Sequence, residues 1–163
     1  MAARPMDAET RAVSDDHGAI RLWLRMLATN RLVETRTRRL LQERYATTLP
    51  RFDLMAQLER APRGLKMGEL SKRMMVTGGN VTGITDGLAK EGLVERAADP
   101  ADRRAWLVRL TPAGRRAFTA MAEEHERWIV ESFSGLSVRE MSTMAALLAR
   151  LKTHVRSLEE RDA

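Results

Sequence analysis

The sequence predicts a mainly α-helical fold with one small β-hairpin, and three observations lead to this prediction. Apolar residues recur every three or four positions over most of the chain, which is typical of amphipathic helices. Two short segments on either side of residue 100 read as strands, and the second alternates apolar and polar residues. Prolines and glycines stand between these segments, where helices begin and end. With 44% apolar and 31% charged residues among 163, the composition is that of a globular protein.

The N-terminal part of the chain predicts an arm and two helices. Residues 1–16 are polar and mixed, which predicts a flexible arm. Residues 17–45 lack proline and carry apolar side chains at helical spacing, so we expect one long helix there. Thr48 and Pro50 mark the start of a second helix, because a hydroxyl can cap free N–H groups and a proline suits the first turn. Pro62 and Gly64 mark its end. The apolar residues that recur at helical spacing are Ile20, Trp23, Leu24 and Leu27 in the first helix, and those that form an apolar stripe in the second are Leu49, Phe52, Met55 and Leu58.

The central segment, residues 47–116, predicts a winged helix-turn-helix domain. Helices at 67–74 and 80–91 flank a break at 76–79, and Gly92 suits the position that follows the second helix. Strands at 94–97 and 104–110 flank a turn at 98–103, with Trp106, Val108 and Leu110 alternating onto one face. Two short helices joined by a tight turn form a helix-turn-helix, and the hairpin is its wing.

The C-terminal part predicts two further helices. Thr111 and Pro112 begin the first and Gly135 ends it, while Ser137 and Glu140 form a capping box at the start of the second. The apolar residues of the last helix then follow steps of three and four, the pattern of a coiled-coil seam. We interpret residues 17–46 and 117–160 as a helical dimerisation region; packing within the chain is the alternative. The seam consists of Met141, Met144, Leu148, Leu151, Val155 and Leu158, and the stripe of the preceding helix consists of Phe118, Met121, His125, Trp128 and Phe133.

Composition and motifs exclude several classes of protein. Without cysteine, the chain has no disulfide, no thiolate metal site and no catalytic thiol. Three scattered histidines, with no H-E-x-x-H and no nucleophile motif, argue against an enzyme and against a metal site. The chain lacks G-x-G-x-x-G and G-K-[ST] loops, so we expect no cofactor. The longest apolar stretch, residues 20–28, contains two arginines and is too short to cross a bilayer, and no signal peptide is evident. We therefore expect a cytoplasmic protein without a membrane partner.

The excess of positive charge lies in the central segment. The chain has a formal net charge of +6, and residues 60–116 alone carry 12 basic and 6 acidic residues. A solvated basic face is the alternative, but a helix-turn-helix in this segment favours double-stranded DNA as the partner.

The start of the second short helix carries the side chains expected to read bases. Asn80 can pair with adenine, and Thr82 can hydrogen-bond a base or offer its methyl group to thymine. Gly78, Gly79 and Gly83 permit close approach to DNA, and N–H groups at a helix start attract phosphate. A plain turn at Gly78 and Gly79 is the alternative.

The wing carries a second expected contact. Arg104 can reach a minor groove, held in place by Asp102. An ordinary surface ion pair is the alternative interpretation of these two residues. A winged-helix module that binds protein rather than DNA is a second candidate function, and it would not need the paired arginines.

Three runs of residues closely resemble the multiple-antibiotic-resistance-regulator (MarR) family. They are residues 93–96 (LVER), 99–105 (DPADRRA) and 110–114 (LTPAG), joined by residues 68–71 (GELS). The resemblance covers about residues 20–158. It implies a homodimer of winged-helix domains that regulates transcription at a palindromic operator, usually as a repressor; an activator of the same family is the alternative. By position, it assigns base reading to Asn80 and Thr82, the minor-groove contact to Arg104 with its partner Asp102, and phosphate contacts to Thr77, Lys72, Arg73 and Arg103.

The resemblance also implies an effector pocket between the dimerisation helices and the winged domain, often for aromatic carboxylates. Residues 49–55 and 76–80 are similar to regulators of aromatic-acid degradation, some of which respond to acyl-CoA thioesters. The basic run between residues 31 and 44 would then meet CoA phosphates or remain a solvated face. The candidate residues that would line the effector pocket are His17, Arg21, Trp23, Phe52, Met55, Trp106 and His125. For the apolar residues among them, packing in the protein core is the alternative interpretation. The redox-sensing branch of the family needs a cysteine, which this chain lacks.

Overall fold

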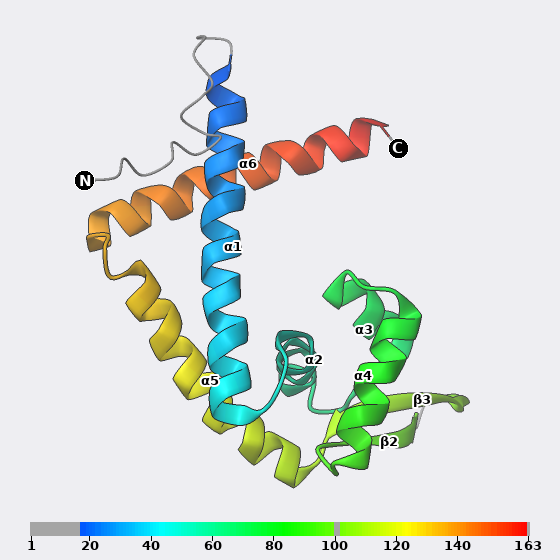
Figure 1. Cartoon of the computed structure of the whole chain (residues 1–163). Coiled ribbons are helices and arrows are strands. Elements are labelled where there is room, and N and C mark those ends of the chain that lie inside the picture. Colours follow the sequence, from blue (N-terminus) through cyan, green and yellow to red (C-terminus); the bar gives the residue numbers. More distant parts are fainter. Residues whose placement is uncertain (1–16, 100–101, 163) are drawn as a thin grey trace. The chain divides into compact units, whose positions relative to one another are not determined.

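The computed structural model describes residues 17–99 and 102–162, with the backbone alone at 102–105 and 162. The described chain is mainly helical, with one small antiparallel sheet (Figure 1). It divides into two compact units at residues 125 and 126, and each is described by itself. The predicted arm, residues 1–16, lies outside the described residues. The elements are α1 (Gly18–Tyr45), α2 (Leu49–Glu59), β1 (Leu65–Lys66), α3 (Met67–Met74), α4 (Gly78–Lys90), β2 (Val94–Asp99), β3 (Asp102–Leu110), α5 (Pro112–Phe133) and α6 (Val138–Asp162).

The first two helices form as predicted, apart from one cap. α1 ends at Ala46, whose left-handed backbone (φ 47°) turns its N–H toward the carbonyl of Gln42. Thr48 occupies the N-cap position of α2 and Pro50 lies in the first turn, but the Thr48 side chain makes no capping hydrogen bond. A proline removes one free N–H from that turn, which leaves fewer donors for a cap to satisfy.

The turn of the helix-turn-helix lies earlier than the sequence predicted. Met75 ends α3 in the left-handed region (φ 54°), and α4 begins at Gly78 rather than at Asn80. The two glycines, which suggested a break, form the first turn of α4, with the N–H of Val81 bonded to the carbonyl of Thr77. Met75, a residue that rarely adopts a positive φ, makes the chain reversal instead.

The sheet has a strand that the sequence did not indicate. β2 and β3 form the predicted antiparallel hairpin, but β2 extends to Asp99 and β3 begins at Asp102, both within the turn predicted at 98–103, because strand pairing continues toward the tip. β1 pairs with the other edge of β3, which gives the order β1-β3-β2. β1 has two residues, too few to show any alternation. Trp106 was expected to share the buried face of Val108 and Leu110, but it is 58% exposed. It lies nearer the hairpin tip than the segment that pairs with β1, beyond the part of the sheet that covers the helices.

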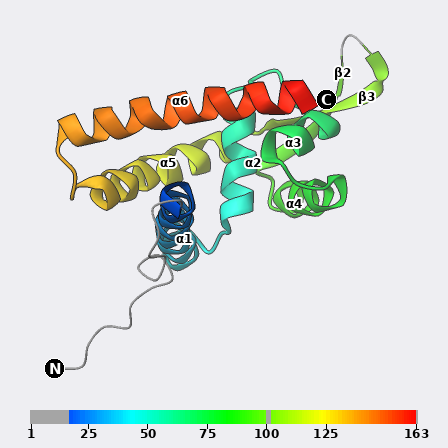
Figure 2. The ribbon, with the colours of Figure 1, turned by 90° about the horizontal axis from the view of Figure 1, so that it is seen from above.

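The core of the first unit joins α2, α3 and α4 to the sheet. These elements contact one another, and Figure 2 shows the three helices grouped at the base of the hairpin. Gly114 is required at the start of α5, because a Cβ there would lie 1.8 Å from the carbonyl oxygen of Leu93. Gly92 has a φ of 71° and follows α4 as predicted. The completely buried apolar side chains include Leu54, Leu58, Leu70, Val81, Leu88 and Val108.

The second unit contains the end of α5 and the whole of α6. The predicted capping box at the start of α6 is confirmed. The Glu140 carboxylate accepts hydrogen bonds from the N–H (2.8 Å) and the hydroxyl (2.6 Å) of Ser137, and the Ser137 hydroxyl oxygen accepts one from the N–H of Glu140 (3.3 Å). The predicted seam is half-exposed in the isolated chain, with Met144, Leu148, Leu151, Val155 and Leu158 between 37% and 45% accessible. Within the described residues, no helix has the length and apolar character to cross a bilayer.

Candidate nucleic-acid interface

The outer face of α4 is bare backbone over its first two turns. Val81, Thr85 and Leu88 are buried and define the inner face of this helix. At about 100° per residue, Gly79 and Gly83 lie on the opposite side. A Cβ added to either glycine would meet no atom within 4 Å. Another molecule can therefore approach the axis of α4 more closely than ordinary side chains would allow.

Asn80 and Thr82, the predicted base-reading residues, lie on opposite flanks of this bare face. Their positions differ by about 160° around the helix axis, since two residues turn by roughly 200°. Both residues are exposed. The Thr82 hydroxyl donates to the carbonyl of Gly78 at 3.0 Å, so its methyl group and oxygen lone pairs remain for other contacts. Asn80 therefore presents an amide on one side of the bare face of α4, and Thr82 presents a methyl group and oxygen lone pairs on the other.

A hollow of about 320 Å³ lies between the start of α2 and the bare face of α4. Arg51 of α2 lines it and contacts Glu91, the C-cap residue of α4. This contact lowers the pKa of the Glu91 carboxyl. Arg51 was not among the predicted site residues, because nothing in its spacing connects it with a helix that begins 27 residues later. The residues that line the hollow are Thr48, Arg51, Gly79, Asn80, Gly83, Ile84 and Gly87.

Of the predicted phosphate-contacting residues, Lys72, Arg73 and Thr77 lie on or just after α3, next to the start of α4, whereas Arg103 lies in the wing. Lys72 and Arg73 are exposed on the last turn of α3, where Arg73 also pairs with Glu69 at 2.5 Å. Thr77 is the N-cap residue of α4, and its side chain makes no capping bond. Gly78 lies in the first turn and is exposed, with no atom within 4 Å of a built Cβ. The free N–H groups there carry the positive end of the helix dipole.

The hairpin is tied to α4 by an ion pair. Arg96 on β2 contacts Asp86 on α4 at 2.5 Å, which fixes the base of the wing beside the helix. The backbone of β3 begins at Asp102, which pairs in register with Asp99. The side chains of Asp102, Arg103 and Arg104 lie outside the described residues, and the expected contact between Asp102 and Arg104 stays a prediction.

The predicted effector residues are brought together only in part. The rings of Phe52 and His125 lie 4.8 Å apart, and burial lowers the pKa of His125 below its usual 6.5. Met55 is buried in the core at 1% exposure, which agrees with its alternative interpretation as a packing residue. Trp23 and Trp106 are exposed on separate elements. His17 is also exposed and Arg21 is half-buried, both at the start of α1.

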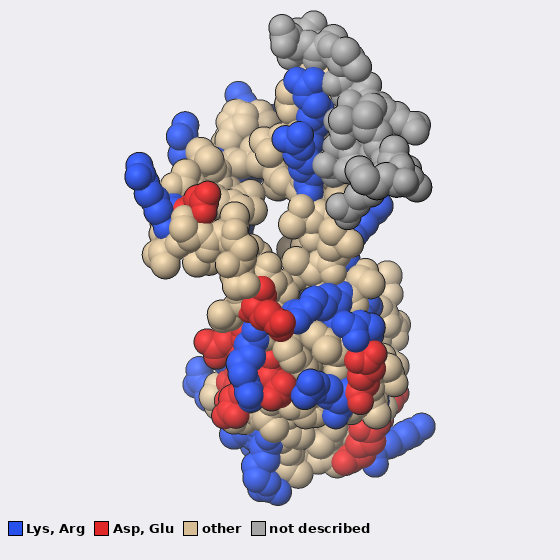
Figure 3. Space-filling model, turned by 60° about the vertical axis from the view of Figure 1, so that its left-hand side comes forward, with Lys and Arg blue, Asp and Glu red and all other residues tan. Residues whose placement is uncertain are grey.

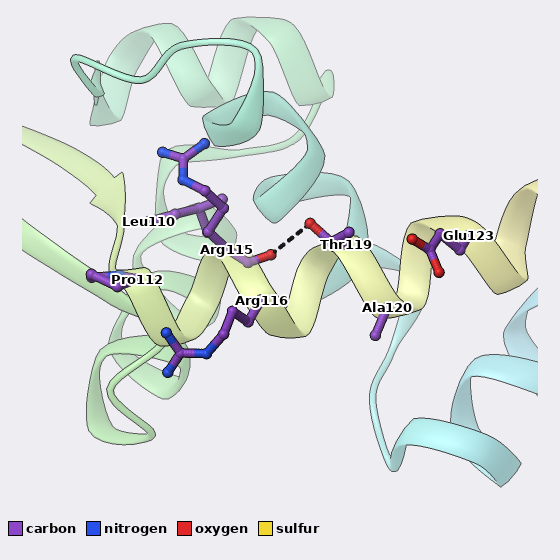
Figure 4. Close-up of a pocket in the computed structure, with 7 residues that line it drawn as sticks. All are labelled: Leu110, Pro112, Arg115, Arg116, Thr119, Ala120 and Glu123. Atoms are coloured by element: carbon purple, nitrogen blue, oxygen red, sulfur yellow. Dashed lines mark hydrogen bonds between the residues drawn. The ribbon is translucent and has the colours of Figure 1, made fainter.

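A larger hollow of about 650 Å³ lies along the start of α5 and contains none of these predicted residues. Arg115 and Arg116 leave α5 on different sides (Figure 4). Arg115 contacts Glu59 of α2 at 2.8 Å, while Arg116 is exposed. The residues that line this hollow are Leu110, Pro112, Arg115, Arg116, Thr119, Ala120 and Glu123.

The segment of α1 between residues 31 and 44, described above as basic, also contains acidic residues that pair with its arginines. Arg38 pairs with Glu34, and Arg39 pairs with Glu43 at 3.0 Å, each one helical turn apart. Arg44 lies 3.8 Å from Glu124 of α5. Figure 3 shows acidic and basic side chains intermingled over the lower half of one face of the molecule. These pairs favour a solvated face over a binding surface for CoA phosphates.

Comparison with known proteins identifies the family and the fold of this chain. A family model described as MarR family matches residues 47–106, the segment from just before α2 into β3. A MarR family transcriptional regulator from Silicibacter pomeroyi, whose crystal structure is known, is 35% identical; the alignment covers 87% of this chain and 99% of that one, with a TM-score of 0.75. The transcriptional regulator YdgJ of Bacillus subtilis is 29% identical over 109 residues, which are 67% of this chain and 66% of YdgJ, just under two thirds. A mutant MarR from E. coli complexed with operator DNA shares the fold, with a TM-score of 0.72, 24% identity and coverage of 85% and 98%. The chain belongs to the MarR family of transcriptional regulators.

Proposed function

We propose that this protein binds double-stranded DNA as a homodimer and represses transcription from a palindromic operator until a small effector releases it. The observation that carries the proposal is the bare outer face of α4, flanked by Asn80 and Thr82 and bordered by the exposed cations of α3. A helix with this surface fits a major groove, where recognition helices read base edges near their N-termini. The related E. coli protein complexed with operator DNA supports the same role.

The flanking residues suggest how α4 reads sequence. Asn80 has an amide that can pair with the N6 and N7 edge of adenine. The Thr82 hydroxyl donates to Gly78, so the expected base contact of Thr82 is its methyl group against a thymine methyl. The N–H groups of the first turn are proposed to contact phosphates, together with Lys72, Arg73, Thr77 and Arg103. Arg104, oriented by Asp102, is proposed to enter the neighbouring minor groove from the wing.

The half-exposed seam of α6 supports a dimer. Its five apolar side chains between residues 144 and 158 follow a heptad pattern and are 37–45% accessible in one chain. A stripe of this kind is expected to be covered in solution, because exposed contiguous apolar surface favours association. A two-fold dimer places its recognition helices on half-sites about one helical turn, roughly 34–36 Å, apart. Operator symmetry would follow from protein symmetry.

The effector is proposed to be a small aromatic carboxylate or its CoA thioester. The hollow along α5 has a volume in the range of small-molecule sites, about 300–1,000 Å³, and an exposed arginine, Arg116, on its wall. A carboxylate could pair with that guanidinium while its ring covers the apolar part of the wall. Release requires that the effector bind the arrangement unable to hold DNA better than the competent one.

Three measurements test the proposal. In a salt titration with duplex DNA, the log of affinity should fall linearly with the log of salt concentration, by about 0.9 for each neutralised phosphate. A winged-helix module that binds only protein would show no such dependence. Arg104→Ala should weaken operator binding by roughly 1–3 kcal/mol without unfolding the protein. Transcription in vitro from a bound promoter separates a repressor from an activator, because an activator would raise the transcript level.

The effector has its own assay. A thermal-shift screen of aromatic acids and their CoA thioesters should identify a compound that stabilises the free protein and lowers its affinity for DNA. Arg116→Ala should reduce that stabilisation if the hollow along α5 is the site. An effector response that Arg116→Ala leaves unchanged would place the site elsewhere.

A further inference from the structure

Arg51 connects the first turn of α2 with the far end of α4. Its Nη2 donates to Oε2 of Glu91, and its Nη1 lies 3.7 Å from the place that a Cβ on Gly87 would occupy. The guanidinium therefore crosses α4 over bare backbone, at the edge of the hollow that also contains Gly79 and Gly83. This side chain borders the face of α4 that we propose meets DNA.

The resting position of Arg51 leaves one strong donor unsatisfied. Its Nε is buried and has no hydrogen-bond acceptor among the residues that the structure describes. A buried donor without an acceptor costs free energy that is recovered when the group finds a partner. The side chain of Glu91 is 52% exposed, so its attraction for Arg51 is screened by solvent. A stronger or additional anion can therefore compete with Glu91 for the guanidinium.

The hollow beside Arg51 has the chemistry of an anion site. No carboxylate is among its lining residues. Thr48 lines it with a hydroxyl that makes no capping hydrogen bond to α2. Asn80 adds an amide donor on the opposite wall. A phosphate oxygen in this hollow could accept from Arg51 and Thr48 together.

We propose that Arg51 binds a phosphate of the DNA backbone beside the groove that α4 enters, and that it releases Glu91 to do so. This inference rests on the proposed function, because it needs the outer face of α4 to meet DNA. Glu91 then acts as an internal competitor that neutralises Arg51 while no DNA is bound. A DNA phosphate is favoured over a free anion because the hollow is continuous with the bare face of α4.

The test uses a labelled mixed-sequence duplex of about 30 base pairs, since phosphate contacts do not depend on base sequence. Affinity is measured by fluorescence anisotropy over a range of salt concentrations for wild type, Arg51→Gln, Arg51→Lys, Glu91→Gln and the double variant Arg51→Gln/Glu91→Gln. Arg51→Gln should weaken binding and reduce the salt slope by about 0.9 for each Arg51 engaged, while Arg51→Lys should keep most of the slope. Glu91→Gln should bind roughly two- to five-fold more tightly, because an exposed ion pair no longer has to be broken.

The double variant distinguishes an exchange of partners at Arg51 from general charge repulsion and from a purely positioning role of the ion pair. If Arg51 exchanges partners, the gain from Glu91→Gln disappears when Arg51 is absent. An equal gain in both backgrounds would show general charge repulsion and overturn the proposal. Weaker binding by Glu91→Gln would show that the pair merely positions α4, which also overturns it. Circular dichroism and thermal midpoints establish that each variant is folded.

The binding data distinguish failure of the proposed function from failure of this inference. If wild-type protein shows no salt-dependent affinity for any duplex, the proposed function fails and this inference fails with it. If wild type binds DNA but Arg51→Gln binds with an unchanged slope, only the inference fails. If inorganic phosphate, titrated at constant ionic strength, stabilises wild type more than Arg51→Gln while both bind DNA with the same salt slope, the hollow is a site for a free anion and the DNA contact is overturned.

Discussion

Replacing Gly83 by alanine should stabilise the fold and weaken DNA binding at the same time. Gly83 lies within α4, on the face opposite the buried residues, and a Cβ there would meet no atom within 4 Å. Alanine therefore adds no clash in the free protein. Glycine in a helix interior costs about 0.8–1.0 kcal/mol relative to alanine. The free energy of unfolding should rise by roughly 1 kcal/mol, which corresponds to about 2–4 °C in the midpoint for a chain of this size.

The same methyl group should lower the affinity of the protein for DNA. If the bare face of α4 packs directly against the walls of the major groove, an added carbon must displace either the helix or the DNA. Overpacking of a close-fitting contact costs roughly 1–3 kcal/mol, which is about a five- to 150-fold loss of affinity. Urea and thermal unfolding give the first quantity, and anisotropy of a labelled duplex gives the second.

Gly18 provides a control that is distant in sequence from α4. Gly18→Ala adds a methyl group to the first turn of α1, where a Cβ also meets nothing within 4 Å, and it should leave DNA affinity unchanged. A Gly83→Ala variant that is stabilised yet binds DNA as tightly as wild type would show that the bare face of α4 does not lie against the duplex. That result would refute the reasoning behind the interface.

Three other predictions concern stability and assembly. Met75→Gly should raise the thermal midpoint, because Met75 is 92% exposed with a φ of 54° and glycine removes a strain of about 1–2 kcal/mol; an unchanged or lower midpoint would contradict this. Leu151→Glu, in the seam of α6, should convert a dimer into a monomer in light scattering, and a dimer that persists would exclude the seam. Stability should fall as the pH drops below about 6.5, because burial lowers the pKa of His125 and the unfolded chain then binds a proton more readily. His125→Gln should flatten that part of the pH profile of the thermal midpoint.

Local patterns predicted most of the helices, because their causes are local. The capping box at Ser137 and the bounds of α3 were visible as short-range signals. The turn before α4 was misplaced because two adjacent glycines are typical of a turn, whereas the protein forms its reversal at Met75. β1 could not be predicted, since its two residues are held by pairing with a strand about 40 positions later. The prediction that Trp106 is buried was wrong for a similar reason. Alternation of apolar and polar residues assigns Trp106 to a face of the strand, but it does not show how far along the strand the helices cover that face.

The candidate site was predicted by type but not by geometry. The glycines, Asn80 and Thr82 were predicted as candidates because they are concentrated at one helix start, which the sequence displays directly. The hydrogen bond from the Thr82 hydroxyl to Gly78, which reduces that residue to its methyl group and lone pairs, depends on the helix starting two residues early. The contact between Arg51 and Glu91 joins positions 40 residues apart and follows only from the packing of α2 against α4.

The glycines of α4 also explain why this helix needs its neighbours. Gly79, Gly83 and Gly87 remove side chains from the outer face and lower the intrinsic stability of the helix by about 1 kcal/mol for each interior glycine. Short helices in water are marginal even with good helix formers, so α4 must be held by tertiary contacts. Those contacts come from its buried inner face and from two ion pairs, one to α2 and one to β2. A change in the position of α2 would therefore disturb α4 directly, and Arg51, which extends from α2 to α4, would carry part of that disturbance to the face of α4 that we propose meets DNA.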